Sequence, residues 1–352
     1  MNICIITVYN SENCGSFLQA YALKTILEKL GHNVYFLERN KKDTSHSLKP
    51  HIKDSIKKLL QLQFEDCKNI WKRYSAFSNA QTLFTTTNKS EKIYNEMDCF
   101  IIGSDTVWNL NSKYFSKNTD IYFGKNLSSK KIITYAVSAA NTPKDKFIHN
   151  KTAIECSHKI SDISVRDDAT YEIVRDIFNM NSTIVCDPTL LLNKNDYNWL
   201  IKDMPCFDHS PILIYYFGNL SDNSIKQIKK LREKTGKRII SFGQHRTWCD
   251  INLPFDPYLF IQCYRDCSFV ITNTFHGTIF SLIYEKNFAN YGQEKKKIES
   301  LLKSVGAEKT FVQSNDNLLP FYENQLDYND INKKIGVQKN TSLEFLKRNL
   351  ND

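Results

Sequence analysis

Several features that would assign a protein to a class at once are missing from this sequence. No window approaches the run of roughly 20 apolar residues that a membrane-spanning helix needs. The first residues, Met-Asn-Ile-Cys-Ile-Ile-Thr-Val-Tyr, are typical of a β-strand. They do not form a charged leader followed by an apolar run, so we expect no signal peptide and a cytoplasmic protein.

The cysteine residues form no metal-binding pattern. There are ten of them, scattered among apolar neighbours, and none belongs to a C-x-x-C pair. Cys263 and Cys267 have the i,i+4 spacing of a helix, but no His or second Cys pair lies near them in the sequence to complete a zinc site. The first βαβ turn also lacks the dinucleotide-binding fingerprint, because only Gly15 is present there. We expect a reduced protein without a structural metal.

The positive charge is concentrated in one segment. The net charge is +9, and residues 41–92 hold eleven Lys and Arg against five Asp and Glu. Over residues 49–60, Lys53, Lys57 and Lys58 alternate with apolar residues, which predicts a basic amphipathic helix. This helix has two interpretations. Either it packs on the core and exposes its lysines to solvent, or its lysines bind an anionic membrane or phosphorylated ligands. We expect no nucleic acid partner, because the segment has no interleaved glycines or stacking aromatics.

Apolar strands and helical segments alternate along most of the chain. We predict strands at 3–8, 34–37, 99–102, 131–137, 160–165, 183–186, 212–217, 238–242, 269–272 and 288–291. This alternation implies parallel sheets with right-handed crossovers. The predicted fold is α/β, with two Rossmann-like domains that face each other across a cleft, as in the glycosyltransferase-B architecture.

The same pattern predicts the domain boundaries. Residues 1–192 would form the first domain, including the basic insert at 41–92, and 193–210 would be a polar linker. Residues 211–310 would form the second domain, and 311–352 a tail that closes with a helix over 343–350.

One histidine lies where such folds place ligands. His276 follows the strand at 269–272, and we expect a helix to open at Gly277. The carboxyl ends of parallel strands form the ligand crevice, and a following helix offers free N–H groups to an anion. A loop histidine can also be purely structural, so His276 needs support from other motifs.

Two other strand ends carry polar residues. Asn13, Gly15 and Ser16 would either hold an anion or a sugar at the helix start, or only cap the helix. Arg166 follows the strand at 160–165 and suits a carboxylate or phosphate. Its alternative is a salt bridge to an adjacent aspartate, Asp167 or Asp168.

Five motifs occur in order over most of the chain, roughly residues 3–305. They are Asn13-x-Gly15-Ser16 with Leu18-Gln-Ala-Tyr-Ala-Leu23, Ile102-Gly103-Ser104-Asp105 with Val107-Trp108-Asn109, Ile163-Ser-Val-Arg166-Asp167, Asp187-Pro-Thr-Leu-Leu191 and Thr272-x-x-Phe275-His276-Gly277-Thr278. Together they resemble the polysaccharide pyruvyl transferase family. One departure is Thr106, where the family usually has glutamine. The basic segment at 41–92 has no counterpart that we can match by motif.

This resemblance implies transfer of pyruvate from phosphoenolpyruvate to two hydroxyls of a sugar, giving a cyclic ketal and phosphate. The acceptor would be a glycan intermediate, often lipid-linked, of capsule, exopolysaccharide or cell-wall synthesis. Arg166 and Lys297 would bind the anionic donor, although Lys295 or Lys296 could take the place of Lys297. No step requires a metal or an organic cofactor.

Within this chemistry His276 would act as general acid toward the enol or as base for the attacking hydroxyl. The N–H groups of Gly277 and Thr278 would hold the phosphate. The polar residues Gly103, Ser104 and Asp105 would lie at the crevice edge and contact substrate, unless Asp105 is only a helix cap.

Two alternatives remain. One is a nucleotide-sugar glycosyltransferase of the same architecture, which would commonly carry a carboxylate on the helix after His276. Here that helix has no acid before Glu285. The other is a non-catalytic sugar-binding protein, which would have little need to bring Arg166, His276 and a lysine together.

Overall fold

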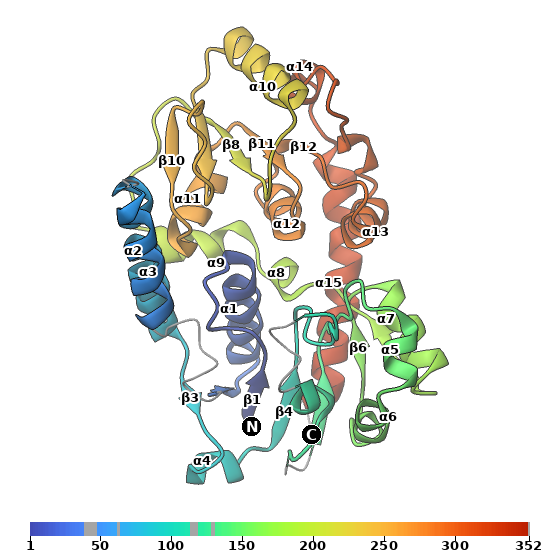
Figure 1. Cartoon of the computed structure of the whole chain (residues 1–352). Coiled ribbons are helices and arrows are strands. Elements are labelled where there is room, and N and C mark those ends of the chain that lie inside the picture. The colour runs from blue at the N-terminus through green and yellow to red at the C-terminus, as the bar shows by residue number, and fades with distance from the viewer. Residues whose placement is uncertain (39–47, 62–63, 113–118, 128–130, 351–352) are drawn as a thin grey trace.

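The chain folds into two α/β lobes stacked one above the other, with the N-terminal lobe at the bottom of Figure 1. The computed structural model describes all residues except 39–47, 62–63, 113–118, 128–130 and 351–352. Parts of the predicted basic insert therefore lie outside the described residues. Within the described part, no helix is both long and apolar enough to cross a bilayer.

The N-terminal lobe is built on a parallel sheet of five strands in the order β3-β2-β1-β4-β5. These are β1 (Asn2–Ile6), β2 (Asn33–Leu37), β3 (Thr86–Thr87), β4 (Cys99–Ile102) and β5 (Lys131–Thr134). A short parallel pair, β6 (Ser164–Val165) and β7 (Thr183–Ile184), extends the sheet through a bridge between Val137 and Val165. The sheet order places the ends of β1, β4 and β6 along one edge.

Helices connect these strands. They are α1 (Cys14–Lys29), α2 (Leu48–Leu60), α3 (Phe64–Ala80), α4 (Lys92–Asn95), α5 (Lys144–Ile148), α6 (Lys151–Ser157), α7 (Asp168–Asp176) and α8 (Pro188–Leu191), with 3-10 turns η1 (Gln81–Leu83) and η2 (Thr119–Phe123). The α2–α3 hairpin lies on one flank of the molecule, beside α1 and α11 (Figure 1).

The C-terminal lobe repeats the plan with the strand order β10-β9-β8-β11-β12, and all its strand pairs are parallel. The strands are β8 (Ile212–Tyr215), β9 (Ile239–Phe242), β10 (Ile251–Leu253), β11 (Phe269–Thr272) and β12 (Asn287–Asn290). The helices are α10 (Asp222–Thr235), α11 (Pro257–Asp266), α12 (Phe275–Ile283), α13 (Lys296–Val305) and α14 (Leu319–Glu323), with the 3-10 turn η4 (Glu308–Thr310). The predicted fold class is confirmed.

The two lobes share an apolar core. It joins Ile3 and Phe17 of the N-terminal lobe to Tyr215 and Phe260 of the C-terminal lobe, and each lobe has a further apolar cluster of its own. The expected linker at 193–210 contains α9 (Lys194–Asn198) and the 3-10 turn η3 (Trp199–Ile201), and Tyr197 within it is fully buried. This segment therefore packs into the shared core and is not an exposed linker. The position of the domain boundary stays a prediction.

The chain ends in a helix that bridges the lobes. The helix predicted over 343–350 is the last part of α15 (Tyr328–Leu350), a helix of 23 residues. Near its start, Tyr328 donates a hydrogen bond to the Lys286 carbonyl, and farther on the Ser342 hydroxyl accepts one from the Cys186 N–H. The helix therefore runs from the C-terminal lobe to the N-terminal lobe (Figure 1). It helps to fix the lobes in the arrangement that forms the site.

Candidate active site between the lobes

His276 lies at the start of α12, directly after β11. The helix begins two residues earlier than predicted, because the Thr274 hydroxyl caps it by accepting the Gly277 N–H at 2.9 Å. His276 is therefore in the first helical turn and not in the turn before it. Its side chain is only 14% exposed.

The expected phosphate cradle at Gly277 and Thr278 is not available in this conformation. The Gly277 N–H donates to the Thr274 side chain, and the Thr278 N–H donates to the Thr274 carbonyl at 3.0 Å. The Thr278 hydroxyl is also used, since it donates to the Thr274 carbonyl and accepts from Asn290. Both amides belong to the helix cap, so their predicted role is corrected to a structural one.

The Asn13 to Ser16 turn meets His276 from the other lobe. Asn13 caps α1 by accepting the N–H groups of Gly15 and Ser16, which is the structural alternative of the two that the sequence left open. A Cβ atom placed on Gly15 would lie 2.1 Å from His276 Nδ1. Glycine is therefore required at this position for the imidazole to approach the backbone.

Ser16 connects this turn to the second predicted motif. Its hydroxyl donates to Asp105 Oδ2 at 2.7 Å, and Asp105 has a φ of 75°. Gly103 is needed for close packing, because a Cβ there would lie 2.4 Å from the Tyr135 carbonyl oxygen. Ser104 is buried, and its hydroxyl has no partner among the described residues. Asp105 is the member of this motif that couples electrostatically to His276 and Arg166.

Arg166 is paired with a residue to which the sequence analysis gave no role. Its Nη1 donates to Asp187 Oδ2 at 2.6 Å, and the two side chains are 4% and 1% exposed. The adjacent aspartates are occupied elsewhere: Asp167 caps α7, and Asp168 accepts a hydrogen bond from Ser300. The proposed salt-bridge alternative was therefore correct in kind but named the wrong partners.

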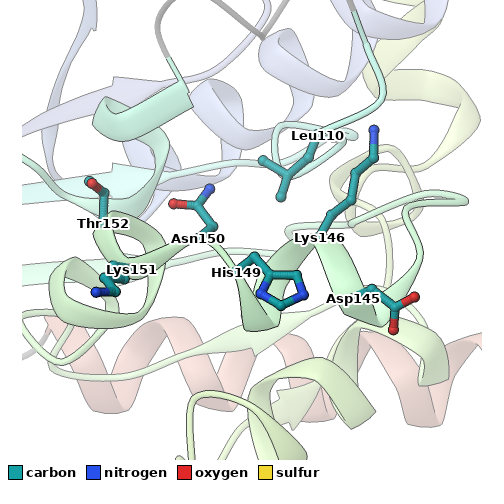
Figure 2. Close-up of a pocket in the computed structure, with 7 residues that line it drawn as sticks. All are labelled: Leu110, Asp145, Lys146, His149, Asn150, Lys151 and Thr152. Atoms are coloured by element: carbon teal, nitrogen blue, oxygen red, sulfur yellow. The ribbon is translucent and has the colours of Figure 1, made fainter.

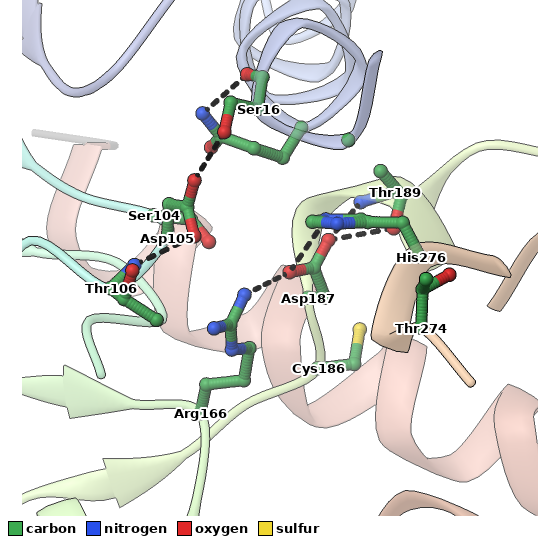
Figure 3. Close-up of polar contacts among 12 residues, drawn as sticks. Ser16, Ser104, Asp105, Thr106, Arg166, Cys186, Asp187, Thr189, Thr274 and His276 are labelled. Carbon is green, nitrogen blue, oxygen red and sulfur yellow. Dashed lines mark hydrogen bonds and ion pairs between the residues drawn. The ribbon is translucent and has the colours of Figure 1, made fainter. Parts of the chain in front are cut away.

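Asp187 lies between two of the predicted site residues, Arg166 and His276. Its Oδ1 accepts the Thr189 N–H and hydroxyl at the start of α8, while Oδ2 faces Arg166 and lies 3.9 Å from His276 Nε2. Figure 3 shows Asp187 between the guanidinium and the imidazole. Its position directly after a predicted strand, within a recognised motif, was the available signal.

Phe275 carries two cations against its ring. The Arg166 guanidinium carbon is 4.6 Å from the ring centroid, and Lys297 Nζ is 5.5 Å from it. Of the neighbouring lysines, Lys295 donates to the Asn273 carbonyl at 2.7 Å, and Lys296 is exposed. Lys297 is thus the lysine of this run that lies beside Arg166.

The charged groups of the site shift one another's pKa values. Burial would raise the pKa of the Asp105 and Asp187 carboxyls. The charges of Arg166 and His276, together with hydrogen bonds from Ser16 to Asp105 and from Thr189 to Asp187, outweigh it, so both pKa values lie below the ordinary one. Burial lowers the pKa of His276, and with repulsion from Arg166 and Lys297 it outweighs the attraction of Asp187 and Asp105. Burial, followed by repulsion from Arg166, also lowers the pKa of Lys297. At neutral pH the imidazole is therefore uncharged.

A cavity of about 440 Å³ lies beside this cluster. It is lined by Arg166 and Asp187 of the N-terminal lobe, by Phe275 and Lys297 of the C-terminal lobe, and by Gln338 of α15. His276 does not line it, but its Nε2 lies 3.9 Å from Oδ2 of Asp187, which does. The arrangement suits an anion that carries more than one charged group.

A larger cavity, about 710 Å³, lies elsewhere on the N-terminal lobe. Figure 2 shows its lining by residues around α5 and α6, with Leu110, Lys146 and His149 among them. None of the predicted site residues lines it. Throughout the described residues, no group of three or more His, Cys, Asp or Glu side chains is placed to hold a metal ion.

Solved structures with similar folds define the class of architecture. A protein from Listeria monocytogenes assigned as a UDP-N-acetylglucosamine 2-epimerase aligns with a TM-score of 0.58 at 9% identity, covering 98% of this chain and 95% of its own. The Neisseria meningitidis UDP-GlcNAc 2-epimerase bound to UDP-GlcNAc gives 0.53 at 9% identity, with 98% and 100% covered. An α-glucosyltransferase in complex with UDP gives 0.50 at 11%, with 99% and 96% covered. At these identities the likeness shows the fold alone, which is of the glycosyltransferase-B type.

The family follows from the sequence. The family model for polysaccharide pyruvyl transferases matches residues 13–293, and the chain belongs to this family. The match includes the five motifs from Asn13 to Thr278, and so confirms the resemblance from which they were read. Among curated proteins, none matches the sequence.

The contact between Gly15 and His276 can be tested with a double-mutant cycle. Gly15→Ala should lower the free energy of unfolding by about 1–3 kcal/mol, because the new methyl group overpacks the imidazole. Adding His276→Ala should remove most of that penalty, which urea unfolding of the four proteins would measure. As a matched control, Gly336→Ala in α15 meets nothing within 4 Å and should not destabilise the protein. Additive effects of Gly15→Ala and His276→Ala would show that the two residues are not in contact.

The buried imidazole should make stability depend on pH. Since the pKa of His276 lies below 6.5 in the folded protein, the unfolded chain takes up the proton first. The free energy of unfolding should therefore fall as the pH drops below about 6.5, and this contribution should level off below the folded pKa. Urea unfolding of wild type and His276→Gln between pH 7 and 5 would measure it. Equal slopes for the two proteins would contradict the prediction.

Proposed function

We propose that this protein transfers pyruvate from phosphoenolpyruvate to two hydroxyls of a sugar, forming a cyclic ketal and releasing phosphate. Family membership supports polysaccharide pyruvylation in general. The observation that carries the specific proposal is the convergence of Arg166 and His276 on one buried carboxylate, Asp187, with Lys297 beside Arg166 at the Phe275 ring.

The donor makes demands that these residues can meet. Phosphoenolpyruvate carries a carboxylate and a phosphate on the same carbon, C2, so its site needs more than one cation. Arg166 offers a planar guanidinium fixed in place by Asp187, and its Nε is buried without a hydrogen-bond partner among the described residues. Lys297 adds a charge that no carboxylate pairs with in the described part of the chain. We assign the anion to the cavity beside these two side chains.

His276 would handle the proton. In the reaction C3 of the enol gains a proton, and one sugar hydroxyl oxygen bonds to C2. The C2–O bond to phosphate then breaks with its electron pair on the leaving group, and the second hydroxyl closes the ketal. One hydroxyl proton balances the proton gained by C3, and the other leaves with phosphate. A bound anion raises the pKa of a neighbouring histidine, so donor binding would prepare the neutral imidazole to act as an acid.

The chief alternative is a glycosyltransferase that uses a nucleotide sugar, since structural neighbours are described in complex with UDP or UDP-GlcNAc. The first acid after His276 is Glu285, which lies beyond the end of α12. It forms an ion pair with Lys194 and is 39% exposed. No carboxylate on α12 is therefore in place to hold a donor ribose.

Donor identity can be tested through adjacent lysines. Phosphoenolpyruvate should raise the thermal midpoint of wild type and of Lys296→Gln, because a ligand that binds only the native state stabilises it. Lys297→Gln should bind the donor at least about tenfold more weakly, the loss expected for one charge-assisted contact.

Two further measurements distinguish the proposed function from its alternative. His276→Gln should keep donor binding but lose phosphoenolpyruvate-dependent phosphate release with a sugar acceptor. Stabilisation by UDP-GlcNAc and none by phosphoenolpyruvate would instead support the glycosyltransferase alternative.

We also propose that the enzyme works at the cytoplasmic face of a membrane, on a lipid-linked intermediate of capsule, exopolysaccharide or cell-wall synthesis. The support is an unusual surface on the α2–α3 hairpin. Among described residues it bears seven of the twelve exposed large apolar side chains: Leu48, Ile52, Ile56, Leu59, Leu60, Phe64 and Trp71. Lys53 and Lys57 are exposed on the same helix as most of these. Apolar side chains flanked by lysines suit an anionic bilayer interface.

Vesicle binding would test this surface. Lys53→Glu/Lys57→Glu should weaken co-sedimentation with phosphatidylglycerol vesicles at least tenfold, since each lysine near an anionic surface contributes about 1 kcal/mol. The control Lys229→Glu/Lys230→Glu changes the net charge equally on exposed positions of α10. Equal loss in both variants would show that net charge, and not the hairpin, governs binding.

A further inference from the structure

The loop that follows β8 carries an exposed aromatic side chain close to the turn that leads to His276. Phe217 lies two residues beyond β8 and is 39% exposed. In the sheet, Tyr215 pairs with Thr272 of the neighbouring strand β11. Phe217 therefore lies about one strand spacing, roughly 4.8 Å, from the chain that enters α12. An exposed apolar residue is ordinary by itself, so its surroundings decide what it does.

Four hydrogen bonds from side chains fix the backbone around this ring. The Asn273 side chain accepts the Phe217 N–H and donates to the Phe217 carbonyl, both at 2.9 Å. Arg246 Nη2 donates to the carbonyls on either side, those of Tyr216 and Gly218, both at 3.0 Å. The loop is thus held from two directions. A loop that is already fixed loses little conformational entropy when it binds a ligand.

Arg246 is unusual because its charge serves only to hold this region. It is 9% exposed, and its other side-chain hydrogen bond goes to the neutral Gln244 Oε1 at 2.9 Å. Among the side chains that the structure describes, no carboxylate pairs with it. A buried cation without a counter-ion is unfavourable, so a loop that only connected β8 to α10 would gain nothing from it. The arrangement has a purpose if the exact position of the Phe217 ring matters.

Aromatic neighbours support the ring, and open space lies beside it. Phe217 contacts Tyr215 and Phe255 edge-on, with ring centroids 5.3 and 5.8 Å apart. Phe255 is itself fixed over Gly243, where a Cβ atom would overlap its ring. Gly218, the residue after Phe217, has a φ of 92°, and a Cβ atom there would meet nothing within 4 Å. The ring is therefore both rigidly placed and accessible.

We propose that Phe217 is a platform on which the sugar ring of the acceptor stacks, so that the apolar face of a hexopyranose is recognised there. The inference rests on the proposed pyruvyl transfer, which requires a sugar within reach of His276. The face of an aromatic ring is electron-rich, and the C–H groups on one face of a pyranose carry partial positive charge, so the two faces attract each other. Tyr215 connects the platform to the reaction centre, because its Cδ1 would lie 2.9 Å from a Cβ atom on Gly277.

The strand order gives donor and acceptor opposite sides of His276. The strand β11, which leads to His276, lies between β12 and β8. Lys297, which lines the cavity assigned to the donor, follows β12, and Phe217 follows β8. A sugar stacked on Phe217 would therefore present its hydroxyls to His276 from the side away from the donor anion. Because stacking needs no charge, this contact is independent of the cations that bind the donor.

Three substitutions test the platform. Phe217→Leu keeps an apolar side chain but removes the aromatic face, whereas Phe217→Tyr keeps that face. Trp199→Ala is the control, because Trp199 is a 64% exposed aromatic residue of η3. The probes are the methyl glycosides of galactose, glucose and mannose, which carry no phosphate and no aromatic group, titrated by saturation-transfer NMR.

The expected order of affinities follows from the loss of one aromatic contact. The glycoside that binds wild type best should bind Phe217→Tyr and Trp199→Ala within about twofold of wild type, and Phe217→Leu at least about fivefold more weakly. If no glycoside binds wild type, or if Phe217→Leu binds it as tightly as Phe217→Tyr does, the platform is wrong.

Phosphoenolpyruvate serves as the reference ligand. It should raise the thermal midpoint of all four proteins by the same amount, which also shows that the variants fold. If Phe217→Leu loses donor and glycoside binding together, the ring only supports the fold of the site and the proposal is overturned. If the glycosides behave as expected while phosphoenolpyruvate stabilises none of the proteins, the platform stands as a sugar site and the pyruvyl transfer proposal fails.

UDP distinguishes a sugar platform from a surface for a nucleotide base, which is also flat and aromatic. Under the proposal, UDP should not compete with the bound glycoside. Stabilisation of wild type by UDP that disappears in Phe217→Leu, with glycoside affinity unchanged, would assign the ring to a nucleotide and overturn the proposal.

Discussion

The buried carboxylate of Asp187 is the constraint on which the site depends. A guanidinium as enclosed as that of Arg166 could not stay charged and stable without a counter-ion. One oxygen of Asp187 balances that charge and faces His276, and the other caps α8. The end of β6, the start of α8 and the first turn of α12 are therefore held in register by one side chain. The geometry of the cluster follows from charge balance as much as from apolar packing.

That charge balance works only if the lobes stay close together. His276 belongs to the C-terminal lobe, but it packs on Gly15 of the N-terminal lobe, where a methyl group would not fit. The shared core and α15 maintain this approach, and α15 also lines the cavity through Gln338. The site is thus a property of the interface, and neither lobe contains it alone.

Local sequence patterns were sufficient for the fold and for most of the site's components. Alternating apolar runs predicted most of both sheets, but two edge strands were missed: β3 has only two residues, and β10 has three half-buried ones. The Thr274 cap could have been read from a threonine three residues before Gly277, and would have corrected the amide roles. The position of Asp187 after a predicted strand marked it as a candidate, but its role was hidden because its motif looks like a helix cap and is one. Its contacts to Arg166 and His276 join segments that only the folded chain brings together.

The cavity beside the cluster combines two kinds of cation. Arg166 is fixed by the Asp187 carboxylate, whereas Lys297 forms no ion pair among the described residues. A paired arginine supplies directed donors without net charge, and an unpaired cation supplies the net charge that attracts an anion. A donor with two anionic groups would need both at one position.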